Sequence, residues 1–170
     1  LESFPDWERD FAPAHSGPMT PAPVQGLLDA CGCLPYPIST VQIVGSKGKG
    51  TLVLLMERLL LGLGLRVGAY TSPHLFERRE RIRIDGTPIE WQQWEQAASI
   101  MRAVSTGALS RFEVETAMAL WCFVDAGVDL VLLEAGMGGI GDATSAVPAE
   151  ILVFTSVERE HRAILGETEE

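Results

Sequence analysis

The sequence predicts an α/β fold with a doubly wound, mostly parallel sheet. Short apolar runs of strand length alternate with segments of helix length, which is the pattern of a parallel sheet with helices on both faces. A glycine-rich loop separates the first apolar run from the helix after it, and the other unusual residues also follow such runs. The 170 residues are enough for one domain with a hydrophobic core.

The expected elements begin at residue 24, after a proline-rich stretch that we expect to form an irregular N-terminal arm over 1–23. β-Branched and apolar runs predict the strands, because such residues dominate buried parallel strands. Gly62 and Gly64 mark the end of the leucine-rich helix. Strands are expected over 41–44, 66–70, 81–84, 130–133 and 151–155, and helices over 24–30, 51–63, 90–104 and 113–126.

Composition narrows the classes of function. The net charge is −10, from 13 basic and 23 acidic residues, and a surface of that sign repels nucleic-acid phosphates and anionic lipid. No apolar run is long enough to span a membrane, and residues 1–20 lack the pattern of a secretory signal. Cys31, Cys33 and Cys122 lack zinc-binding spacing. We therefore expect a cytoplasmic protein with free thiols, and neither nucleic acid nor membrane as its partner.

The loop over residues 45–51 has the chemistry of a phosphate-binding loop. It reads Gly-Ser-Lys-Gly-Lys-Gly-Thr and contains both lysines of the sequence. Glycines allow backbone N–H groups to turn toward phosphate oxygens, and the helix N-terminus that follows adds partial positive charge. Lys49 is placed to reach the β- and γ-phosphates, and the Thr51 hydroxyl to bond a phosphate or Mg²⁺. The strict Walker spacing is not met, because Gly50 stands between Lys49 and Thr51.

Three later loops also follow predicted strands, at the edge where open α/β sheets bind ligands. Residues 71–75 read Thr-Ser-Pro-His-Leu, residues 134–145 form a glycine-rich loop that begins with Glu134, and residues 157–161 end at His161. A carboxylate at the end of a strand suits Mg²⁺. Each loop alone is compatible with an ordinary turn, but four such loops at one edge indicate a ligand site.

Taken together, these segments follow the motif order of a known family. The phosphate loop has an extra glycine after its lysine, and further motifs stand at 71–75, 80–82, 112–116, 134–145 and 160–168. Over about residues 24–170 the chain resembles the folylpolyglutamate synthase/dihydrofolate synthase family, the folate branch of the Mur ligase superfamily. The resemblance implies a P-loop NTPase-like fold, similar to the central domain of Mur ligases, with 24–170 as an ATP-binding domain.

Enzymes of that family join L-glutamate to folate or dihydropteroate. ATP phosphorylates the carboxylate of the substrate, and the glutamate amine attacks the acyl phosphate. The resemblance implies catalytic roles for Lys49, Glu134 and His161, and a monomeric full-length protein. Carried over residue by residue, it assigns ATP to Gly48, Lys49, Gly50 and Thr51, Mg²⁺ to Ser72, Glu134 and His161, and the pterin side to Phe112, Asp142 and Ala143.

The chain also differs from that family. It stops before the family's Glu-Lys-Ala-Gly-Ile segment, whose lysine is carbamylated, and before its C-terminal domain, so it resembles an N-terminal ATPase-like domain and not a whole ligase. An alternative is therefore a degenerate, catalytically inactive nucleotide- or folate-binding module of the same fold. The Walker spacing disfavours a plain P-loop kinase, and dihydrofolate synthase and polyglutamylation activities both stay open. The departures from the family pattern are Ser46, Lys47, Ile140, Gly141, Ser145 and Glu160.

Overall fold

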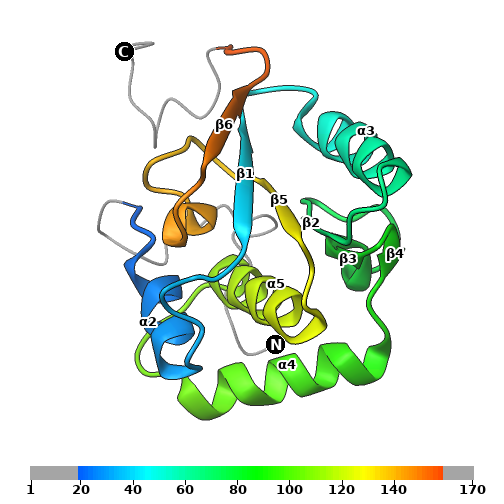
Figure 1. The fold of residues 1–170 in the computed structure, drawn as a ribbon. Helices are drawn as coiled ribbons and strands as arrows, with labels where there is room; N and C mark the ends of the chain where they lie inside the picture. The colour runs from blue at the N-terminus through cyan, green and yellow to red at the C-terminus, as the bar shows by residue number, and fades with distance from the viewer. Residues whose placement is uncertain (1–18, 159–170) are drawn as a thin grey trace.

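The computed structural model describes residues 19–158, and the structural statements below refer to these residues. They form a six-stranded sheet in the order β4-β3-β2-β5-β1-β6 (Figure 1). The strands β2, β5, β1 and β6 run parallel to one another, whereas β3 pairs antiparallel with both β2 and β4. Their bounds are β1 (Ser39–Val44), β2 (Val67–Tyr70), β3 (Ile82–Ile84), β4 (Thr87–Pro88), β5 (Leu130–Glu134) and β6 (Ile151–Phe154).

Helices cover both faces of this sheet. In Figure 1, α3 lies on one side of the central strands and α2, α4 and α5 lie on the other. The α-helices of the described residues are α2 (Ala22–Ala30), α3 (Lys49–Gly62), α4 (Trp91–Val104) and α5 (Arg111–Ala126), and the short 3-10 helices are η1 (Arg78–Arg81) and η2 (Ala143–Ala146).

The core is divided by the sheet into two halves. Along β5, Leu132 packs in the cluster on the α3 side, whereas Val131 and Leu133 pack in the larger cluster that contains residues of α2, α4 and α5. This alternation follows because successive side chains of a strand point to opposite faces. The predicted doubly wound, mostly parallel α/β fold is confirmed.

The predicted elements are present, with ends that shift by one or two residues. Sequence analysis did not anticipate β4, η1 or η2. The first described helix, α2, begins at Ala22, inside the stretch expected to be an irregular arm. Pro23 is compatible with this helix, because the N–H groups of a first helical turn have no partner within the helix. The division of the chain into an arm and a domain remains a prediction.

The antiparallel part of the sheet depends on a tight turn between β3 and β4. Asp85 and Gly86 both have positive φ angles, of 52° and 80°, as in the two-residue turns that suit the twist of a hairpin. The Asp85 carboxylate also accepts the Val67 N–H at 2.9 Å and Arg66 Nε at 3.2 Å. These bonds fasten the hairpin to the start of β2.

Within residues 19–158, no helix is both long and apolar enough to cross a membrane. Cys31, Cys33 and Cys122 are free thiols, as expected. Burial raises the pKa of Cys122 to about 12, so this thiol remains protonated and unreactive at neutral pH.

Replacing Gly68 of β2 with alanine should lower the free energy of unfolding. The new Cβ would lie 2.5 Å from Cδ1 of Phe123, which is buried on α5, and overpacking a core costs about 1–3 kcal/mol. Denaturant unfolding checks this. Gly26→Ala is the matched control. This exposed position in α2 has nothing within 4 Å of the new Cβ, and alanine there should raise the free energy of unfolding by about 0.5–1 kcal/mol. Unchanged stability of Gly68→Ala would contradict the packing described here.

Candidate functional site

The loop over residues 45–51 connects β1 to α3 and lies against the segment that follows β6. Gly45 has a φ of 129°, a conformation that favours glycine. A Cβ on Gly45 would also lie 2.8 Å from the carbonyl oxygen of Ser156. The Ser46 N–H donates to that same oxygen at 2.6 Å. The loop therefore adopts a conformation that a larger residue at position 45 would disrupt.

The helix α3 begins where this loop ends. Gly48 caps it with a φ of 83°, and Lys49 is its first residue, two positions earlier than predicted. N–H groups of a first helical turn lack partners within the helix and carry partial positive charge, which favours an anion at this place. Lys49 Nζ donates to the Gly45 carbonyl at 2.7 Å, so the ammonium group is held at the loop.

The carboxylate of Glu134 lies at the end of β5, beside this helix terminus. It is 6% exposed, and its Oε2 accepts the Ser72 N–H at 3.0 Å. A Cβ on Gly50 would lie 3.2 Å from Oε2, so glycine allows the carboxylate to approach α3 closely. Burial raises the pKa of Glu134, while N–H groups of Ser72 and Gly50 and the charge of Lys49 act in the opposite direction.

Two of the three predicted metal ligands, Ser72 and Glu134, therefore lie side by side, whereas His161 is outside the described residues. No cluster of three or more His, Cys, Asp or Glu side chains that could hold a metal occurs within residues 19–158. A carboxylate beside a serine nevertheless offers the oxygen ligands that Mg²⁺ prefers, and Mg²⁺ usually completes its shell with water and substrate phosphates. The donors present fit Mg²⁺ bound together with a nucleotide.

The three residues assigned to the pterin side also lie together. Phe112 Cζ and Asp142 Oδ2 are 2.6 Å and 3.3 Å from where a Cβ of Gly136 would stand, and Ala143 follows Asp142 as the first residue of η2. Asp142 accepts the N–H groups of Met137 and Thr144, each at 2.9 Å. Burial raises the pKa of Asp142. This cluster lines the base of the glycine-rich loop after β5.

Sequence analysis did not single out several polar residues that hold these loops. Gln42 Nε2 donates to Thr144 Oγ1 at 2.8 Å, which joins β1 to η2. Arg83 and Glu57 are buried and bonded to one another at 3.0 Å. The available signal was a polar residue inside an apolar run, which Gln42 and Glu57 both are.

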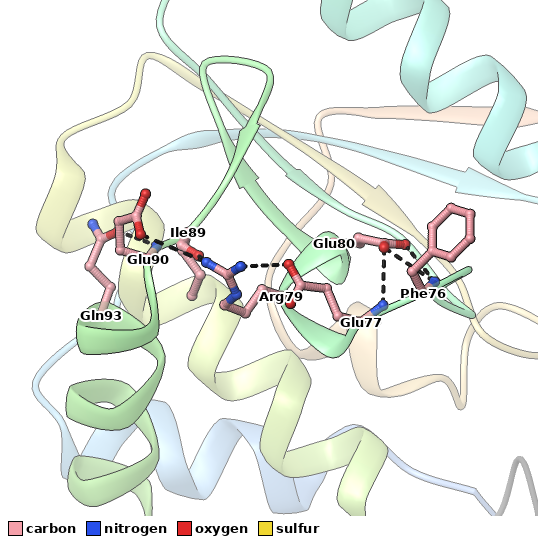
Figure 2. A network of polar contacts seen from close by, with 7 residues as sticks. All are labelled: Phe76, Glu77, Arg79, Glu80, Ile89, Glu90 and Gln93. Carbon is pink, nitrogen blue, oxygen red and sulfur yellow. Dashed lines mark hydrogen bonds and ion pairs between the residues drawn. The ribbon is translucent and has the colours of Figure 1, made fainter.

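The loop that carries Ser72 is held by a network shown in Figure 2. The Glu80 carboxylate accepts the N–H groups of Leu75, Phe76 and Glu77 at 2.9–3.3 Å. These bonds, that of Leu75 first, lower the pKa of Glu80. Arg79 fastens the segment from the other side, through the Glu77 carboxylate and, at 3.1 Å, the Ile89 carbonyl.

The fold and the glycine-rich loop define an α/β phosphate-loop domain, and solved structures share it. Escherichia coli FolC in complex with DHPP and ADP matches with a TM-score of 0.86 and 30% identity, over 95% of this chain and 39% of that one. A Yersinia pestis bifunctional folylpolyglutamate synthase/dihydrofolate synthase, complexed with AMPPNP and Mn, matches with a TM-score of 0.80 and 32% identity, over 85% and 36%. No protein-family model matches the sequence.

Curated relatives agree with these structures. The dihydrofolate synthase/folylpolyglutamate synthase of Haemophilus influenzae is 39% identical over 143 residues, and that of E. coli is 40% identical over 125 residues. The chain belongs to the folylpolyglutamate synthase/dihydrofolate synthase family, which confirms the resemblance. The matches cover 84% and 73% of this chain but only 32% and 30% of those relatives.

Glu80→Gln should loosen residues 75–77, because a neutral amide replaces a carboxylate that accepts their N–H groups. Because the pKa of Glu80 is lowered, its ionised carboxylate stabilises the loop fully at pH values above the ordinary pKa of 4.5. This stabilisation is lost as the pH falls through the lowered pKa. Amide-exchange protection factors of residues 75–77 should therefore fall in Glu80→Gln at neutral pH, and in the unmodified protein only under acid conditions. Glu95→Gln, at an exposed position of α4, is the control. Equal protection in all three proteins at neutral pH would contradict the role of Glu80.

Proposed function

We propose that this chain binds ATP with Mg²⁺ and forms part of a ligase that joins L-glutamate to dihydropteroate or folate. The observation that carries the proposal is the buried Glu134 carboxylate, placed between the N-terminus of α3, Lys49 and Ser72. Structures of relatives contain ADP or AMPPNP with Mn, and one also contains L-glutamate. Because the chain spans 36–39% of those relatives, the complete reaction is proposed for the whole protein.

In this reaction the phosphate loop binds the phosphates of ATP. Lys49 Nζ leaves the Gly45 carbonyl for the γ-phosphate and offsets the charge that develops as the phosphoryl group is transferred. Ser72 and Glu134, with His161 as the third proposed ligand, would hold Mg²⁺, which supplies further charge neutralisation at the phosphates.

The acceptor for the phosphoryl group is the carboxylate of the pterin substrate. Phe112, Asp142 and Ala143 are proposed to bind the pterin end of that substrate. The carboxylate oxygen attacks the γ-phosphorus and ADP leaves. The glutamate amine then attacks the acyl carbon, phosphate leaves, and the amine loses a proton to form the amide.

A catalytically inactive nucleotide- or folate-binding module is the second candidate. Ile140, at a position where the family pattern has arginine, is 96% exposed at the tip of the loop after β5, so this tip has no charge to offer a ligand. Lys47, which adds a cation to the phosphate loop, forms an ion pair with Glu158. Product analysis of the whole protein with Mg·ATP, glutamate and dihydropteroate separates the two candidates, since a module gives binding without a glutamylated product.

We also propose a cytoplasmic location and a monomeric whole protein. The free thiols support a reducing compartment. Fractionation of cells and light scattering of the whole protein test these two points.

Lys49→Ala should weaken binding of Mg·ATP, because it removes a charge-assisted hydrogen bond to a phosphate. Such bonds contribute about 1.5–3 kcal/mol, or roughly 10- to 150-fold in affinity. Calorimetric titration of the 170-residue chain measures the change. Lys47→Ala is the matched control in the same loop and should lose less, because Lys47 is already engaged with Glu158. Equal affinities of Lys49→Ala and the unmodified chain would contradict the phosphate role of Lys49.

A further inference from the structure

A buried ion pair joins α3 to β3 beside the candidate site. Arg83 and Glu57 are 8% and 1% exposed, and Arg83 Nε donates to Glu57 Oε2 at 3.0 Å. The strand register accounts for the pairing. Arg83 lies opposite Ala69 of β2, whose side chain packs in the cluster on the α3 face. Side chains directly opposite in an antiparallel pair share a face, so Arg83 is directed toward α3.

The same guanidinium group holds both ends of the loop between β2 and β3. Its Nη1 donates to Thr71 Oγ1 at 2.9 Å and to the Glu80 carbonyl at 3.0 Å. Thr71 directly follows β2, and Glu80 lies in η1 just before β3. One side chain thus connects α3 to the start and to the end of the loop that carries Ser72.

These contacts end next to the two candidate metal ligands. Thr71 precedes Ser72, whose N–H donates to Glu134 Oε2. Glu57 lies seven residues after Gly50 on α3, which is about two turns along the same side of the helix. The Gly50 N–H also donates to the Glu134 carboxylate. Arg83 therefore fastens together the two segments that hold Glu134.

Stability alone does not account for this arrangement. Burying an ion pair costs desolvation free energy, and replacing such a pair by apolar residues is often neutral or stabilising. Arg83 Nη2 is also buried without a hydrogen-bond partner within the described residues, and an unpaired buried donor lowers stability. A side chain with these costs, placed beside the site, indicates a functional role.

We propose that Arg83 is a positioning residue that keeps Ser72 and Glu134 at the separation needed to bind one divalent cation. It contacts neither the cation nor the nucleotide. Lysine is no substitute, because only a rigid planar fork reaches three partners in fixed directions. The inference rests on the proposed function, in which Ser72 and Glu134 share an ion.

The test measures binding of a fluorescent ATP analogue to the 170-residue chain, with Mg²⁺ and with EDTA. The quantity compared is the ratio of the two affinities, because general damage to the fold weakens both. Arg83→Lys retains the charge but not the fork. Thr71→Val removes one acceptor with little change of shape, which makes it the variant least able to disturb folding. Arg66→Lys is the matched control, because Arg66 pairs with Asp85 at the opposite end of β2.

We expect the ratio to fall by about 10- to 100-fold in Arg83→Lys, the range for groups that orient metal ligands. It should fall by less in Thr71→Val and stay unchanged in Arg66→Lys. Unchanged ratios in Arg83→Lys and Thr71→Val would overturn the role of Arg83 and leave the proposed function standing. If Arg83→Lys does not fold, an unchanged ratio in Thr71→Val alone has the same meaning. If the unmodified chain binds no analogue in either condition, the proposed function and this inference both fail.

Discussion

The arrangement of the site depends on one buried carboxylate. Glu134 ends β5, between β1 and β2 in the sheet, where an unpaired charge would be strongly disfavoured. Its partners come from three other segments: the Gly50 N–H and the charge of Lys49 from the start of α3, the Ser72 N–H from the loop after β2, and the charge of Arg83 from β3. These segments have to converge on the end of β5 to offset the burial that raises the pKa of this carboxylate.

Because side chains alternate along each strand, Glu134 and the Gln42–Thr144 pair lie on opposite faces of the sheet. Glu134 lies two positions after Leu132 and shares its face, toward α3. Gln42 precedes Ile43 of β1, so it points to the opposite face, where it meets Thr144 beside Asp142. The proposed phosphate side and the proposed pterin side therefore lie on different faces of the sheet. A substrate with a pterin at one end and a reactive carboxylate at the other suits that division.

Sequence patterns predicted the elements better than the contacts between them. The strands were found because β-branched and apolar runs end at glycine or polar residues, and the phosphate loop because its glycines and lysines are local in sequence. The pairing of Glu57 with Arg83 joins residues 26 positions apart, and depends on the register of β3 with β2. No local spacing encodes that register. The strand β3 was predicted, but its antiparallel pairing and the partner strand β4 were not, although Asp85-Gly86 is a local signal for a hairpin turn.

Hydrogen bonds hold the loops on both proposed sides of the site before a ligand binds. The loop after β2 is fastened by Glu80 at three N–H groups and by Arg83 at both ends. A cation that binds at Ser72 thus has little ordering entropy to overcome, which increases affinity. The loop after β5 is fastened as well: Asp142 accepts the Met137 N–H, and the Gly139 carbonyl, next to the exposed Ile140, accepts Ser145 Oγ at 2.8 Å. Both loops therefore combine a hydrogen-bonded backbone with an exposed apolar side chain, Phe76 in one and Ile140 in the other.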